Sequence, residues 1–69
     1  AKAYLQKALT LNPDGLDPNY FFGDFLLEQG QPERARVYLR KALAAPARAG
    51  RSIADAGRKQ EAGSLLNTL

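Results

Sequence analysis

Apolar residues recur along this chain with the spacing of α-helices, and turn-forming residues separate the helical stretches. Within residues 19–29, the apolar positions 21, 22, 25 and 26 form a stripe along one side of a helix, which differs from the alternation of a strand. The next stretch has a second stripe on one helical face, made of Ala35, Tyr38, Leu39, Ala42 and Leu43. The pattern predicts an all-α fold.

Proline, glycine and aspartate mark the expected ends of these helices. The segment Asn12-Pro13-Asp14-Gly15 has the composition of a turn, because proline presets one backbone dihedral and glycine permits a positive φ. Asp17-Pro18 is typical of a helix start, with the aspartate as the cap and the proline in the first turn. We expect Gly30 to end that helix, Pro32 to open the next, and the second helix to end near Ala45.

One stretch of the sequence occurs twice. Tyr4-Leu5-Gln6-Lys7-Ala8-Leu9 recurs as Tyr38-Leu39-Arg40-Lys41-Ala42-Leu43, with five of six residues identical at a separation of 34 residues. A period of about 34 residues is the length of one helix–turn–helix unit of the tetratricopeptide repeat. The chain resembles that family over residues 1–45. The residues that match its pattern are Gly23, Gly30, Ala35, Leu39 and Ala42, and Asn12-Pro13 resembles its closing turn.

The resemblance implies a tetratricopeptide-type solenoid fragment with a C-terminal capping helix. Residues 1–11 would be the second helix of a preceding repeat, 12–45 one complete hairpin, and 46–69 a linker with the capping helix. Small residues at Gly23 and Ala35 would let the two helices of the hairpin approach closely.

The sequence departs from the family pattern at one position of the hairpin. Asn19 stands where the family usually has an aromatic residue, and the neighbouring aromatic residues Tyr20, Phe21 and Phe22 are expected to compensate.

Two interpretations are open for residues 46–69. The first is a single helix over about Ser52–Asn67 that covers the open end of the hairpin. Its covering residues would be Ile53, Ala56, Ala62, Leu65, Leu66 and Leu69. The second is a compressed third hairpin, since Gly50, Gly57, Ala62 and Leu66 repeat the spacing of Gly23, Gly30, Ala35 and Leu39 at an offset of 27 residues. At the other end, Leu5, Leu9 and Leu11 are expected to expose an apolar patch that favours self-association.

Composition excludes several kinds of chemistry. The 69 residues carry a net charge of +3 and contain neither cysteine nor histidine, which removes disulfides, thiolate nucleophiles, most zinc sites and the commonest general base. The carboxylates form no catalytic constellation, so we expect no enzyme, no metal and no cofactor. No stretch approaches the roughly 20 apolar residues of a membrane span. The compartment stays open between cytoplasm and periplasm.

The family resemblance implies a binding function. In such repeats, the first helix of each hairpin lines a concave groove that receives a protein or peptide. Matching the motif places Asp17, Tyr20, Asp24, Leu27 and Glu28 in that groove. One aromatic anchor and three acids suit a partner that carries basic residues. Substitution of Arg58, on the expected capping helix, should then leave binding nearly unchanged.

Two other functions are weighed against this one. Residues 30–69 carry eight Lys and Arg against three acids, so nucleic acid or an anionic surface is the less favoured alternative. It would use Arg34, Arg40, Lys41, Arg48, Arg51, Arg58 and Lys59. The chain could also be a structural end segment of a longer array.

A second and weaker resemblance concerns the partner. The stretch from Asn12-Pro13-Asp14-Gly15 through Ala54-Asp55-Ala56-Gly57-Arg58 is similar to the C-terminal part of bacterial repeat proteins associated with TRAP-type transporters. That similarity implies a periplasmic lipoprotein whose partner is a transporter solute-binding protein.

Overall fold

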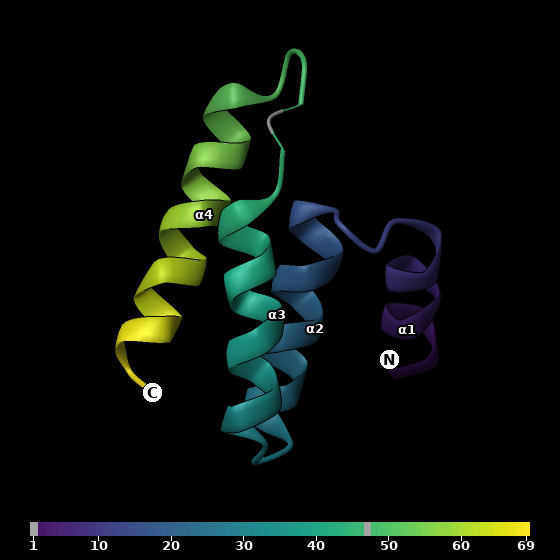
Figure 1. Cartoon of the computed structure of the whole chain (residues 1–69), viewed down its shortest axis with the longest axis vertical. Coiled ribbons are helices and arrows are strands. Elements are labelled where there is room, and N and C mark those ends of the chain that lie inside the picture. The colour runs from purple at the N-terminus through teal and green to yellow at the C-terminus, as the bar shows by residue number, and fades with distance from the viewer. Residues whose placement is uncertain (1, 47) are drawn as a thin grey trace.

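The computed structural model describes residues 2–46 and 48–69 and contains four helices. These are α1 (Lys2–Leu11), α2 (Leu16–Glu28), α3 (Pro32–Ala44) and α4 (Ser52–Asn67). Helices α2 and α3 form an antiparallel hairpin, and α1 and α4 lie on opposite sides of it (Figure 1). The all-α prediction is confirmed. The C-terminal part is one helix, so the compressed third hairpin is wrong.

Glycine residues stand at both ends of α2. Gly30 has a φ of +74°, and its N–H donates to the Leu27 carbonyl while the Gln31 N–H donates to the Leu26 carbonyl. This pair of bonds is the glycine-terminated helix end expected at this position. At the other end, α2 begins at Leu16 after an extended Gly15. The prediction of Asp17 as the cap is therefore wrong, because Asp17 already lies within the first turn.

The hairpin is held together by a close crossing of α2 and α3. A Cβ atom on Gly23 would lie 2.8 Å from Cγ of Leu39 and 3.4 Å from the carbonyl oxygen of Ala35. Ala35 and Leu39 are completely buried. Phe22 fills the space beside the crossing, with its ring centroid 4.8 Å from that of Tyr38 in an edge-to-face arrangement. Small residues at positions 23 and 35 thus let large ones pack around them, as the sequence predicted.

A second apolar cluster joins α4 to the hairpin. Its buried members are Leu16, Leu39, Ala42, Ala45 and Ala62, with Leu65 and Leu66 packed against them. Three of the expected covering residues, Ala62, Leu65 and Leu66, therefore do contact the hairpin. The expectation fails for Ile53, which is 89% exposed, and for the exposed Ala56. The first turns of α4 extend beyond the end of α3, so residues there have no hairpin surface to cover (Figure 1).

Helix α1 is less buried than its sequence copy in α3. Leu5 and Leu9 pack against the cluster of Phe22, Leu26 and Ala35, so they do not form the exposed patch expected of them. Leu11 is 76% exposed, as is Tyr4 at 75%. Helix α3 lies between α2 and α4, whereas α1 packs against α2, which explains the difference between the two copies. Self-association through α1 stays a prediction.

Asn19, where an aromatic residue was expected, is hydrogen-bonded to the turn before α2. Its side chain is fully buried, and its Nδ2 donates to the carbonyl oxygens of Pro13 at 2.9 Å and Gly15 at 2.8 Å. A buried amide that joins two backbone carbonyls fixes the turn between α1 and α2. The neighbouring aromatic residues were expected to compensate for the missing one. Of these, Phe22 is buried at the hairpin crossing.

The linker between α3 and α4 is fastened to α4 by side-chain hydrogen bonds. Nε of Arg48 donates to the two carboxylate oxygens of Asp55 at 3.1 and 3.2 Å, and its Nη2 also donates to that carboxylate. Asp55 is buried at the start of α4, and its hydrogen bonds to Arg48 hold the pKa of this carboxyl below its ordinary value. Nζ of Lys59 donates to the carbonyl oxygen of Ala45 at 2.9 Å. These contacts position α4 against the end of α3.

The crossing predicts how the hairpin responds to added volume. We expect Ala35→Leu to lower the free energy of unfolding by about 1–3 kcal/mol, the usual cost of overpacking. A chain of this size has little stability to lose. Ala44→Leu is the matched control, because Ala44 lies exposed on the same helix. Thermal melts compare the two variants, and equal melting temperatures would mean that position 35 is not at the crossing.

The Arg48–Asp55 pair predicts a dependence of stability on pH. Because the pKa of Asp55 is lower in the folded chain than its ordinary value of 3.8, the pair stabilises the fold above that pH. The contribution is lost as the pH falls through the lowered value. Thermal melts of the unsubstituted chain and of Asp55→Asn should therefore differ at pH 7, and the difference should shrink as the pH falls below 3.8. A constant difference between them at all pH values contradicts this assignment.

Candidate functional site

The five residues predicted to line a groove lie along α2, and the structure gives them different surroundings. Asp17, Tyr20 and Asp24 are half-buried, and Glu28 is exposed. Leu27 packs against both apolar clusters. Leu27 thus belongs largely to the packing of the hairpin, while the other four present polar or aromatic groups at the surface.

Arg58 of α4 meets the N-terminal part of this row. Its guanidinium carbon lies 4.9 Å from the ring centroid of Tyr20 and 4.8 Å from that of Phe21. The two rings stand edge to face with their centroids 5.4 Å apart, and we call them the aromatic pair. A guanidinium within about 6 Å of a ring face is attracted by the negative charge density of that face. Neither Phe21 nor Arg58 was predicted to be part of the site.

Two carboxylates flank the same guanidinium. Nε of Arg58 lies 3.4 Å from Oδ1 of Asp17, and its Nη1 donates to Oε2 of Glu61 at 3.1 Å. The second oxygen of Asp17 lies 3.7 Å from Nη2 of Arg48. We refer to Asp17, Tyr20, Phe21, Arg58 and Glu61 together as the α2–α4 surface. Asp17 therefore has a structural contact with α4 that the sequence analysis did not foresee.

Burial and nearby carboxylates raise the pKa of Tyr20. Burial raises the pKa of the Tyr20 hydroxyl above its ordinary value of 10.0, and the nearby Glu61 carboxylate raises it further. Asp24 acts in the same direction, whereas Arg58 opposes the shift. At neutral pH the hydroxyl keeps its proton and can donate a hydrogen bond.

Arg58 therefore contacts two of the residues predicted to line the groove, Tyr20 and Asp17. We expected its substitution to leave binding nearly unchanged, yet its guanidinium lies over the residue chosen as the anchor. Arg58 cannot serve as a remote control in a binding experiment.

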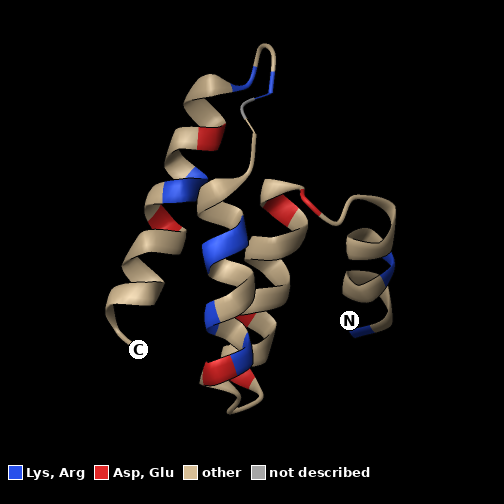
Figure 2. Ribbon diagram, viewed as in Figure 1, with Lys and Arg blue, Asp and Glu red and all other residues tan. Residues whose placement is uncertain are grey.

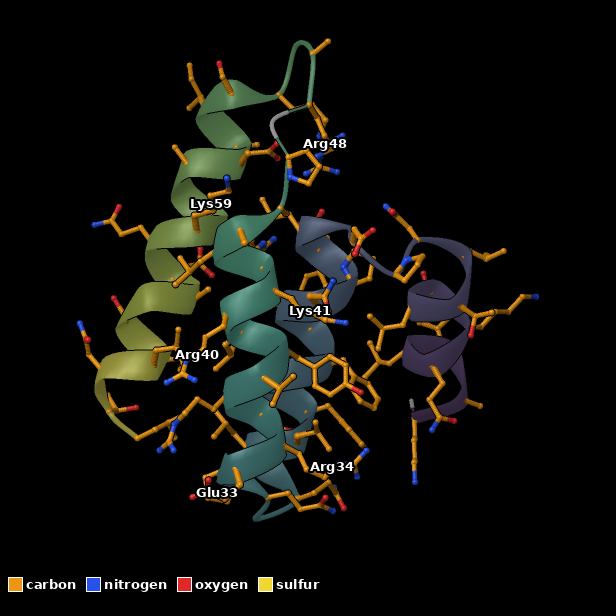
Figure 3. All side chains as sticks on the ribbon, viewed as in Figure 1. Glu33, Arg34, Arg40, Lys41, Arg48 and Lys59 are labelled. Carbon is orange, nitrogen blue, oxygen red and sulfur yellow. The ribbon has the colours of Figure 1, made fainter. Side chains whose placement is uncertain are left out.

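The basic residues of the alternative function are divided between two regions. Arg34, Arg40 and Lys41 extend from exposed positions of α3 (Figure 3). On α4, acidic residues lie on either side of the basic ones (Figure 2). Arg48, Arg58 and Lys59 each bind a carboxylate or carbonyl oxygen of the chain itself. The structure does not gather the seven residues into one cationic face.

Two searches for other kinds of site gave no candidate within residues 2–46 and 48–69. In this part of the chain, no group of three or more acidic, histidine or cysteine side chains is placed to hold a metal ion. None of its helices has the length and apolar character needed to cross a bilayer.

Comparison with known proteins identifies the repeat. A sequence model of the tetratricopeptide repeat matches residues 1–55, which include α1, α2, α3 and the start of α4. Searches of curated proteins and of solved structures each returned no match. The matched segment contains the duplicated stretch and the Gly23–Ala35 crossing, and it covers most of the chain. The chain belongs to the tetratricopeptide repeat family.

Proposed function

We propose that this chain is a non-enzymatic protein-binding module whose α2–α4 surface receives a peptide segment of a partner protein. Tetratricopeptide repeat domains generally mediate interactions between proteins. The observation that carries the proposal is the aromatic pair, which stands at the surface between charged side chains of two helices.

The aromatic pair has the properties of an interface anchor. Phe21 is 41% exposed although it is a large apolar residue, and Tyr20 beside it is half-buried. Tyrosine and phenylalanine bring a large contact area with few rotatable bonds, so burying them in an interface costs little conformational entropy. The exposed part of Phe21 and the half-buried ring of Tyr20 would give a partner an apolar contact.

Charge around the aromatic pair favours a partner with basic residues. The carboxylates of Asp24 and Glu28 belong to the row on α2, whereas those of Asp17 and Glu61 are already paired with Arg58. Clustered charge of one sign attracts an oppositely charged partner and accelerates its association. Arg58 neutralises part of this charge, and Glu28 and Asp24 continue it along α2.

The other candidate functions have less support. Nucleic-acid binding would use Arg48, Arg58 and Lys59, but these residues bind oxygen atoms of the chain itself. A purely structural end segment is an outcome that the experiment below distinguishes. The similarity to proteins associated with TRAP-type transporters finds no support in the family match, so a solute-binding protein stays a hypothesis for the partner.

Tyr20 provides the test of this function. Partners captured from a lysate of the source organism would be identified, and the affinity of each purified partner measured by calorimetry. We expect Tyr20→Ala to weaken binding by more than about 1 kcal/mol, the threshold of a significant interface residue. Asp24→Lys should mainly slow association, with a smaller effect at high salt.

Tyr4→Ala is the matched control, because Tyr4 is a tyrosine that lies exposed on α1. It should leave binding unchanged. A different outcome is that Tyr20→Ala leaves the affinity unchanged while substitution of Arg40 and Lys41 abolishes a salt-sensitive interaction. In that case the exposed basic residues of α3 are the binding site. If no partner distinguishes any of these variants, the chain is a structural segment.

A further inference from the structure

Arg58 covers the aromatic pair of the α2–α4 surface. Its guanidinium lies over both rings of the aromatic pair and between the carboxylates of Asp17 and Glu61. The chain thus places a cation of its own against two π faces and two acids. This arrangement shows directly which chemical group the surface accommodates.

Contacts other than those of Arg58 also hold α4 against the rest of the chain. Ala62 is fully buried against the hairpin, and Leu65 and Leu66 pack around it. The linker is held separately by Arg48 on Asp55. Arg58 keeps 31% of its side chain exposed, so water and salt partly screen its ion pairs. The guanidinium can therefore leave the aromatic pair while α4 stays in place.

We propose that the aromatic pair, together with the Asp17 and Glu61 carboxylates, is an arginine-binding site which Arg58 fills in the free chain, and that an arginine of the partner replaces Arg58 on binding. This inference rests on the proposed function of the α2–α4 surface. It adds that the partner side chain is an arginine and that Arg58 competes with it for the same site.

The geometry favours arginine over lysine and over an acid. A planar guanidinium can stack on an aromatic ring and donate to a carboxylate at each edge, whereas the ammonium of lysine is a compact point charge. An incoming acidic group would have to approach Asp17 and Glu61 as well as Arg58. Asp24, one turn beyond Tyr20, adds a further negative charge to the same side.

A titration with small probes tests the competition. N-acetyl-arginine amide would be added to the full chain, and binding followed by the NMR shifts of the Tyr20 and Phe21 ring protons. The variants are Arg58→Ala, Arg58→Gln and, as a matched control, Arg40→Ala, which removes an exposed arginine of α3. We expect both Arg58 variants to bind the probe about three- to thirtyfold more tightly than the unsubstituted chain, since the cation–aromatic contacts and the ion pairs of Arg58 no longer compete.

Further arms of the titration define the specificity. Arg40→Ala should bind like the unsubstituted chain, and N-acetyl-lysine amide should bind every form more weakly than the arginine probe. N-acetyl-glutamate amide should not bind. Hydrogen exchange of the α4 amides reports whether α4 stays docked in each Arg58 variant.

Three results would overturn the proposal. One is an unchanged or weaker affinity for the arginine probe in both Arg58 variants. Another is binding of the glutamate probe that disappears with Arg58, which would make Arg58 a contact for an anion. The third is loss of α4 protection in both variants, which would make Arg58 a structural link. In each case, the proposed function still holds if Tyr20→Ala weakens partner binding. If Tyr20→Ala leaves partner binding unchanged, the proposed function itself is refuted.

Discussion

The close approach of α2 and α3 at Gly23 and Ala35 is the constraint on which the rest of the structure depends. A Cβ atom at position 23 would lie 2.8 Å from Leu39, so the crossing distance is set by the absence of a side chain there. Leu39 also belongs to the cluster that holds α4. The same residue therefore fills the inside of the hairpin and supports the next helix. Through it, the spacing of α2 and α3 determines where α4 lies and how Arg58 meets Tyr20.

Asp17 connects the stability of this fragment with its binding surface. It lies in the first turn of α2, where a negative charge is favoured by the helix dipole. Its two oxygens face Arg48 of the linker and Arg58 of α4. A residue predicted to contact a partner thus also joins three parts of the chain. Substituting Asp17 would change both stability and binding, so Tyr20 and Asp24 are better probes of function.

Sequence periodicity predicted the architecture well because helix ends and helix crossings depend on local residue types. Gly30, Pro32 and the 34-residue repeat specify where helices end, and Gly23 with Ala35 specifies which faces meet. The exposed Ile53 could not be predicted, because the length of the linker decides how far α4 extends beyond α3. Leu5 and Leu9 were mispredicted for a similar reason, since their burial depends on the angle at which α1 packs on α2.

The candidate site was predicted only on the side that belongs to the repeat. Groove positions on α2 follow from the repeat motif, whereas Arg58 enters the site through contacts between α2 and α4. A signal did exist in the sequence: Asp55, Arg58 and Glu61 are three residues apart and so lie on one side of α4. On this side, Asp55 contacts Arg48 of the linker and Arg58 contacts Asp17 of α2. Arg58 of this charged stripe lies over the Tyr20 and Phe21 rings of α2. Such a contact is better suited to reversible binding than to a hydrophobic core. The α2–α4 contact thus combines apolar packing at Ala62 with a charged and aromatic contact at Arg58.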